Sequence, residues 1–205
     1  MRIAVVTDLH GRTDPSHLAA LHEAARGADA LVACGDWSTF GARETAQRVA
    51  DAVRVAETTC CFVFGNCDAV SNGDELEGWQ NLHARVVEKD GWLFAGVGGS
   101  LPCPSHTPNE IDEAQYAHLL DGIRRACGAR GDRLVLVAHQ PPHGTDADRL
   151  GSGAHVGCAA LRAFIDEVQP ACCLTGHIHE AASRSRVGRT VLLNPGPFAQ
   201  GGRFG

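Results

Sequence analysis

Short apolar runs alternate with longer amphipathic segments along most of this chain. The runs are rich in Val, Ile and Leu, and we expect strands at 2–7, 30–34, 60–64, 92–97, 134–138, 172–175 and 190–193. Apolar residues recur at helical spacing between several of these runs, which predicts helices at 15–26, 42–56, 109–126 and 156–168. Strands that alternate with helices usually pair in parallel and are covered by those helices. The pattern therefore predicts an α/β fold.

Two places interrupt the alternation, because a short turn joins two strand-like runs there. The runs are 85–88 with 92–96 across Asp90-Gly91, and 180–187 with 190–194 across Gly188. These hairpins favour two mixed β-sheets flanked by helices over one open sheet. The longest irregular stretches, 98–108 and 140–155, both follow strands, and loops of that length in a compact domain are usually functional or mobile.

Composition indicates a single globular unit. The 205 residues contain no repeat, linker or low-complexity tract, so we expect one domain over 1–205. No apolar stretch approaches the roughly 18 residues of a membrane span, and the N-terminal run is too short for a signal peptide. We therefore expect a cytoplasmic protein with no membrane partner. The formal net charge of −6 argues against nucleic acid as a partner. Nine cysteines without a C-x-x-C pair suggest reduced thiols used as small core residues.

Oxygen- and nitrogen-bearing side chains follow five of the predicted strands. They are Asp8, His10, Asp36, Asn66, His139, His177 and His179. Because ligand sites in α/β folds form beyond the carboxyl ends of the strands, we expect all seven at one rim. Carboxylate and imidazole without thiolate suit divalent Mn, Fe, Zn, Ni or Co. Seven ligands suit two ions that share Asp36, and ions about 3.5–4 Å apart can hold a hydroxide between them as nucleophile.

The ordered set resembles the motifs of the calcineurin-like metallophosphoesterase superfamily. Its pieces here are Asp8-x-His10, Gly35-Asp36, Gly65-Asn66-x-Asp68, His139 and Gly176-His177-x-His179. The resemblance implies a four-layer αββα sandwich, a binuclear metal centre and hydrolysis of phosphate esters. It implies one metal held by Asp8, His10, Asp36 and His179, and a second held by Asp36, Asn66, His139 and His177. The Gly-Asn-Cys-Asp motif and small size resemble the compact bacterial and archaeal phosphodiesterase branch.

The resemblance implies a catalytic group of Asn66, Cys67, Asp68 and His139. Cys67 departs from the usual motif of the superfamily, which has a histidine at this position. The superfamily histidine at this position is thought to protonate the leaving group, oriented by the following aspartate. A thiol with a pKa of ~8.5 is a poorer acid near neutrality and cannot act as a cation toward a dianionic monoester. This favours diesters or activated leaving groups over alkyl monoesters. The alternative is that Cys67 only packs and water protonates the leaving group. His143 is a further candidate for the acid.

The leading interpretation is a metal-dependent phosphodiesterase that acts on a small-molecule phosphate ester, with manganese among its candidate metals. Two alternatives are a non-catalytic scaffold of the same fold that binds protein partners and a nuclease of the same chemistry. The presence of all seven ligands argues against the scaffold, and the acidic charge argues against the nuclease. Exposed strand edges in such sandwiches are compatible with a homodimer.

Overall fold

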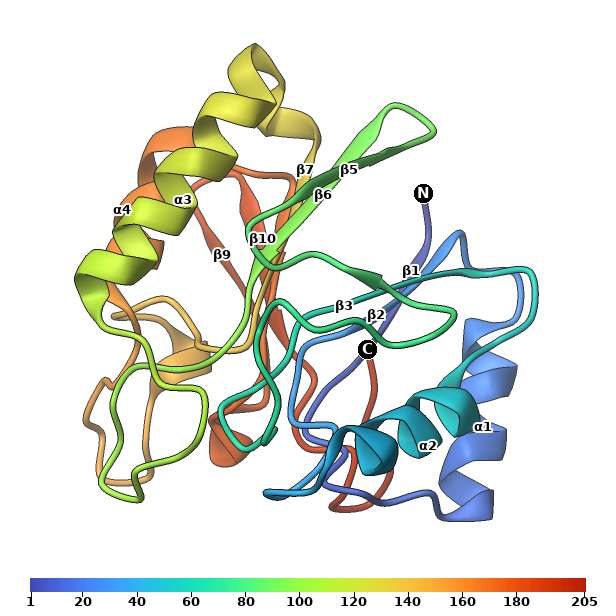
Figure 1. The fold of residues 1–205 in the computed structure, drawn as a ribbon. Coiled ribbons are helices and arrows are strands. Elements are labelled where there is room, and N and C mark those ends of the chain that lie inside the picture. The colour runs from blue at the N-terminus through green and yellow to red at the C-terminus, as the bar shows by residue number, and fades with distance from the viewer.

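Two β-sheets pack face to face in the computed structural model, which describes residues 1–205 (Figure 1). The first sheet has the order β1-β2-β3-β4, with β1 (Ile3–Val6), β2 (Ala30–Ala33), β3 (Thr59–Phe62) and β4 (Gln80–Asn81). The second has the order β5-β6-β7-β8-β10-β9, with β5 (Val86–Lys89), β6 (Trp92–Val97), β7 (Leu134–Ala138), β8 (Cys172–Leu174), β9 (Ser183–Val187) and β10 (Thr190–Asn194).

Only the second sheet is mixed. Both predicted hairpins form, and their antiparallel pairs, β5 with β6 and β9 with β10, lie at the two edges of that sheet. The first sheet is parallel throughout, so the expectation of two mixed sheets is corrected for this one. Its edge strand β4 was not predicted, because two polar residues give no apolar run.

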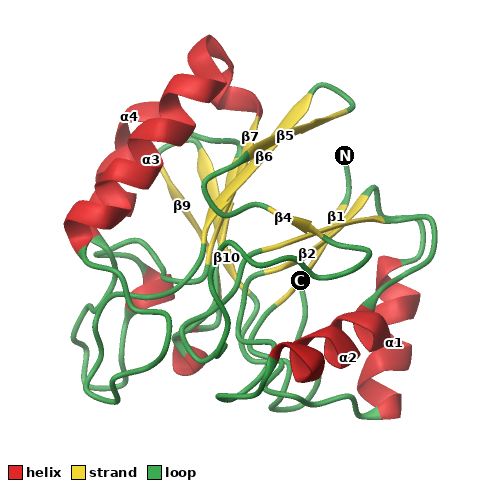
Figure 2. Ribbon diagram, in the orientation of Figure 1, coloured by secondary structure: helices red, strands yellow, loops and turns green.

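Helices cover the outer face of each sheet, as Figure 2 shows. α1 (Pro15–Ala25) and α2 (Arg43–Val53) cover the first sheet, and α3 (Glu113–Cys127) and α4 (Ala159–Val168) cover the second. Short 3₁₀ turns follow at η1 (Gly128–Arg133), η2 (Asp146–Asp148) and η3 (His179–Ala181). None of the helices has the length and apolar character that crossing a lipid bilayer requires.

The third predicted helix begins later than its sequence pattern suggested, and a capping box explains the difference. Asp112 accepts the backbone N–H of Gln115 at 2.8 Å, and the Gln115 side chain accepts the N–H of Asp112 at 2.8 Å. This reciprocal pair fixes the helix start. Residues 109–111 remain irregular and extend toward the loop that carries Asn66, where they contribute to the site described below.

Alternate side chains of each strand enter different layers of the core. In β1, Val6 packs toward the helices of the first sheet while Val5 faces the second sheet. In β7, Leu136 packs toward α3 and α4 while Val137 faces the first sheet. Both faces of each sheet are therefore buried, which is why these strands read as continuous apolar runs. The four-layer αββα arrangement is confirmed.

Candidate metal centre

The predicted ligands gather at the rim where β1, β2, β3, β7 and β8 end. Six of the seven side chains come within 4 Å of another side chain of the set, through the pairs Asp8–His179, His10–His179, His10–Asp36, His139–Asp36 and His139–Asn66. The seventh, His177, stacks obliquely on His139 with 5.0 Å between ring centroids. Parallel strands bring their carboxyl ends to one edge, and that geometry assembles residues that lie up to 171 positions apart in the chain.

One half of the site contains Asp8, His10 and His179. Nε2 of His179 lies 3.2 Å from Asp8 Oδ1 and 3.3 Å from Nε2 of His10. The other Asp8 oxygen accepts the Thr7 hydroxyl at 2.8 Å and the backbone N–H of His177 at 3.1 Å. Asp8 is almost fully buried, and the contacts at both of its oxygens fix its position.

The other half contains Asn66, His139 and His177. The His139 ring is fully buried, and its Nδ1 lies 2.7 Å from the carbonyl oxygen of Cys34. A carbonyl can only accept, so Nδ1 carries the proton and, in the neutral ring, Nε2 presents a lone pair. That Nε2 faces Asn66 Oδ1 at 2.9 Å and Asp36 Oδ1 at 3.5 Å.

Asp36 lies between the two halves. Its Oδ2 is 3.7 Å from Nε2 of His10, and its Oδ1 is 3.5 Å from Nε2 of His139. The side chain is buried, and the backbone N–H of Cys67 donates to Oδ1 at 2.9 Å. One carboxylate therefore presents an oxygen to each half, which is the geometry that a bridging ligand requires.

Several of these residues have strained backbones. Asp8, His10, Asp36 and His177 have φ values of 54°, 48°, 55° and 67°, in the left-handed region that L-residues seldom adopt. Each such residue costs on the order of 1–3 kcal/mol, and strain of this kind clusters at functional sites. Four of the ten non-glycine residues with positive φ are predicted ligands. The strain indicates that the fold holds these side chains in place for a purpose other than stability.

The electrostatics keep the site ready for a cation. Burial lowers the pKa of His177 to about 3, with the neighbouring His139 acting in the same direction, so the ring is neutral at pH 7. Burial alone would raise the pKa of Asp8, but the hydrogen bond from His179 and nearby imidazoles outweigh it and lower the pKa to about 2. The set therefore offers the charged carboxylate of Asp8 and the neutral imidazole of His177 with a free lone pair.

The donor set fits divalent metal ions. Around His139, three lone-pair atoms face one another, namely Nε2 of His139, Oδ1 of Asn66 and Oδ1 of Asp36. Acceptors this close repel unless a proton or cation lies between them. Ligand atoms of Asp8, His10 and His179 also lie within 4.8 Å of one another, as do those of Asp8, Asp36 and His139. Imidazole and carboxylate suit first-row divalent metals, so the residues present match the predicted cofactor.

Cys67 lies at the site, with its sulfur and ligand atoms of His10 and Asp36 all within 4.8 Å of one another. Burial raises the pKa of this thiol well above its usual range, and the charge of Asp36 and its hydrogen bond raise it further. Bound cations would oppose the effect of the carboxylate. The thiol is therefore protonated at neutral pH and contributes no positive charge.

Asp68 is held by backbone amides of two loops. Its carboxylate accepts the backbone N–H groups of Ser38 at 2.8 Å, Gly65 at 2.9 Å and Trp37 at 3.3 Å. Burial and the charge of Asp36 raise its pKa to about 7, against the lowering effect of these amides. No hydrogen bond joins it to the Cys67 side chain, so in this structure Asp68 ties the two ligand-bearing loops together.

The sequence pattern did not predict several residues that contact the ligand side chains on the atoms facing away from the site. Thr39 Oγ1 lies 3.0 Å from Nδ1 of His10, and Gln200 Nε2 lies 3.3 Å from Nδ1 of His179. Thr107 Oγ1 lies 3.0 Å from Nδ2 of Asn66. None belongs to a motif, and only Thr39 lies near a predicted ligand in sequence. His143, the further candidate acid, is exposed and packs 6.0 Å from the His155 ring, without a hydrogen bond to any ligand.

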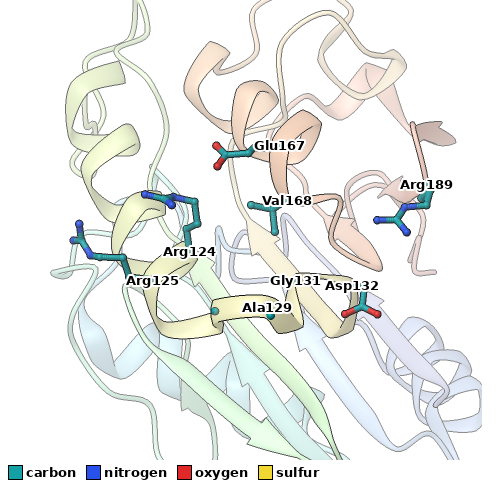
Figure 3. Close-up of a pocket in the computed structure, with 9 residues that line it drawn as sticks. Arg124, Arg125, Ala129, Gly131, Asp132, Glu167, Val168 and Arg189 are labelled. Carbon is teal, nitrogen blue, oxygen red and sulfur yellow. The ribbon is translucent and has the colours of Figure 1, made fainter.

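A hollow of about 640 Å³ elsewhere on the surface does not compete with this site (Figure 3). It is formed by η1, the C-terminal ends of α3 and α4, and Arg189, so it lies at the opposite end of the second sheet from the ligands. Its charged lining is mixed, with Arg124, Arg125, Asp132, Glu167 and Arg189. Arg124 and Arg125 are already paired with Asp121. The hollow therefore has no surplus of one charge that would indicate a ligand.

Comparisons with known proteins agree with the geometry. The family model of the calcineurin-like phosphoesterase superfamily domain matches residues 1–203. The uncharacterized protein MJ1162 of Methanocaldococcus jannaschii is 35% identical over 204 residues, which cover 96% of this chain and 88% of that protein.

Solved structures show the same fold. The crystal structure of TT1561 of Thermus thermophilus has a TM-score of 0.70 at 18% identity, and the match covers 98% of this chain and 91% of the TT1561 chain. A dimetal phosphatase from Danio rerio has a TM-score of 0.62 at 12% identity, with coverages of 98% and 88%. At these identities, the structural likeness establishes the fold alone.

Proposed function

Because this chain belongs to the calcineurin-like phosphoesterase superfamily, we propose that it is a phosphodiesterase that uses two divalent metal ions. The proposal assigns one catalytic domain to residues 1–205. It assigns as metal ligands Asp8, His10, Asp36, Asn66, His139, His177 and His179. A small-molecule phosphate diester is the proposed substrate.

The position of Asp36 supports this proposal most directly. Its two oxygens face His10 on one side and His139 on the other, at 3.7 and 3.5 Å. A carboxylate that served only one ion, or only a structural hydrogen bond, would have no reason to present both oxygens to imidazoles. Its burial and its fixed contact with the Cys67 N–H keep this orientation before any ion binds.

When bound, a pair of divalent ions supplies a nucleophile from water near neutral pH and withdraws charge from a phosphoryl oxygen. The protein's own residues supply orientation. The Cys34 carbonyl holds the His139 ring with Nε2 inward, and the His177 N–H and Thr7 hydroxyl hold Asp8. Such outer contacts raise ligand basicity and fix ring orientation.

The preference for diesters rests on Cys67. A monoester carries up to two negative charges, and its alcohol leaving group benefits from a proton donor. The neutral thiol beside Asp36 neither balances that charge nor gives up its proton readily. A diester carries one negative charge and so places less demand on charge balance, and an activated leaving group departs without a proton donor. The side chain at this position therefore favours diesters and activated leaving groups.

Replacement of Asp36 by asparagine tests the proposal. Asp36→Asn keeps the shape of the side chain but removes the charge that two ions would share. We expect hydrolysis of bis-p-nitrophenyl phosphate to fall by at least about 100-fold. Asp51→Asn, on an exposed position of α2, is the matched control and should retain full activity. Undiminished turnover by a folded Asp36→Asn protein would refute the proposed function.

A further inference from the structure

The segment between β6 and α3 contacts the side chain of Asn66. Asn66 is buried, with Oδ1 at 2.9 Å from Nε2 of His139 and Nδ2 at 3.0 Å from Oγ1 of Thr107. Thr107 is 41 residues away in the sequence and lies in the long irregular stretch after β6. One end of the amide thus faces the metal ligands, and the other faces this segment.

The Thr107 hydroxyl has only one proton to donate, and Glu110 determines where it points. Oε1 of Glu110 lies 2.8 Å from Thr107 Oγ1 and 2.7 Å from the Thr107 backbone N. A carboxylate only accepts, so the hydroxyl proton points to Glu110 and its lone pairs remain for the Asn66 Nδ2. The thiol of Cys103 donates to the same carboxylate oxygen at 3.1 Å. Glu110 therefore links Cys103 and Thr107 within the segment 103–110.

This chain of donors permits one orientation of the Asn66 amide. With the amide reversed, Oδ1 would face the lone pairs of Thr107, two acceptors in contact, and Nδ2 would replace the oxygen beside His139. Only an oxygen can ligate a metal ion at that place. We propose that Thr107 and Glu110 are positioning residues that keep Oδ1 of Asn66 turned toward the second metal ion, an inference that rests on the proposed function.

The backbone of the same segment is fastened to the Asn66 loop, so the contact belongs to the fold. The Asn109 N–H donates to the carbonyl of Asn66 at 3.1 Å. The Asn109 side-chain Nδ2 donates to the carbonyls of Asp68 and Val70, both at 2.7 Å. Asn109 thus fixes the loop from outside while Thr107 fixes the side chain within it.

The positioning should act on one of the two ions only. The ligands of the first ion have their own supports, with Thr39 beside His10 and Gln200 beside His179. None of these hydrogen-bonds to the segment 103–110. Removal of the Thr107 hydroxyl should therefore weaken the ion at Asn66 and leave the ion at His10 and His179 almost unaffected.

Manganese titration of metal-stripped protein, followed by the electron paramagnetic resonance signal of free Mn²⁺, tests this inference without an activity assay. The variants are Thr107→Val, which keeps the shape without the hydroxyl, and Thr107→Ser, which restores the hydroxyl. Thr58→Val, before β3 and away from the site, is the matched control. We expect two ions in the wild type, a loss of about 10–100-fold in affinity for one ion in Thr107→Val, and recovery in Thr107→Ser.

The outcomes separate the two proposals. Two ions of unchanged affinity in Thr107→Val, or equal weakening of both, would overturn the positioning role and leave the proposed function intact. Fewer than two ions in the wild type would overturn both. If Thr107→Val does not fold, Glu110→Ala takes its place, because the freed hydroxyl should again weaken one ion selectively.

Discussion

A Cβ atom on Gly65 would lie 2.0 Å from Oδ1 of Asp36 and 2.4 Å from the Asp36 backbone N. Real Cβ atoms do not approach other heavy atoms this closely, so only glycine lets the loop after β3 pass the proposed bridging carboxylate. The close approach also brings the Cys67 N–H to Asp36 Oδ1 at 2.9 Å. The glycine of the third motif is therefore part of the construction of the metal site.

Gly65→Ala should therefore displace Asp36 and impair both ions. We expect a loss of about 1–3 kcal/mol in the free energy of unfolding from overpacking, together with loss of Mn²⁺ binding. Urea unfolding and equilibrium dialysis measure the two effects. Gly122→Ala is the control, because Gly122 lies within α3 with nothing within 4 Å of its Cβ position. That change should raise the unfolding free energy by about 0.5–1 kcal/mol. Wild-type metal binding in Gly65→Ala would contradict the role of the close approach.

Cys67→His should shift the substrate preference toward monoesters. An imidazole with an ordinary pKa of ~6.5 can donate a proton at neutral pH, which the Cys67 thiol does not do readily. Because p-nitrophenolate leaves without a proton, the sensitive substrate is an alkyl phosphate monoester, and we expect its turnover to rise at least about tenfold relative to that of the diester. The ratio of the two rates, measured with the same metal loading, is the relevant quantity.

Cys67→Ser is the matched control for that change, because it keeps the size and neutrality of the side chain. It should leave the ratio of diester to monoester turnover near the wild-type value. Monoester turnover that does not change in Cys67→His would show that the residue at this position only packs, as the alternative interpretation holds.

Asp148 organises the long loop 140–158 around one buried carboxylate. It accepts the backbone N–H groups of Thr145 at 2.8 Å, Gly157 at 2.9 Å and Gly144 at 3.1 Å, and Nδ1 of His155 lies 2.7 Å away. In Asp148→Asn, the amide NH₂ would face donors, so we expect the unfolding free energy to fall by about 1–3 kcal/mol. Asp146→Asn, exposed in the same 3₁₀ turn, should have little effect.

The same contacts predict how this contribution varies with pH. Burial alone would raise the pKa of Asp148, but the hydrogen bonds from His155 and the backbone amides outweigh it and lower the pKa. A carboxylate with a lowered pKa stabilises the fold above its unfolded pKa of ~3.9, and that stabilisation is lost as the pH falls through the lowered value. The difference between wild type and Asp148→Asn should thus be full at pH 7 and shrink below about pH 4. A difference that grows on acidification would contradict this account.

Removal of metal should destabilise the protein, because the buried charges and lone pairs of the metal-ligating side chains face one another and repel. Ions that bind only the folded state should stabilise it by about 2.7 kcal/mol when the free metal is 100 times its dissociation constant. Calorimetry with and without a chelator measures this as a fall in Tm that added Mn²⁺ reverses. An unchanged Tm after chelation would show that the folded protein holds no metal.

The sequence was sufficient to predict the architecture where the signal is local. The apolar runs predicted β1, β2, β3, β7 and β8, and the residues after them do meet at one rim. The left-handed conformation of Asp8 and Asp36 could not be foreseen, since tertiary contacts impose it against local preference. The contact of Thr107 and Glu110 with the site could not be predicted either. Both lie in an irregular segment whose path depends on the capping box at Asp112 and the contacts of Asn109.

The most direct test of the central claim is hydrolysis of bis-p-nitrophenyl phosphate beside p-nitrophenyl phosphate by metal-stripped protein titrated with Mn²⁺, Ni²⁺, Zn²⁺ and Mg²⁺. The account predicts no turnover without metal, a rate that saturates as a second ion binds, and a diester rate above the monoester rate. A protein that binds two ions per chain and hydrolyses neither ester with any of the four metals would contradict it.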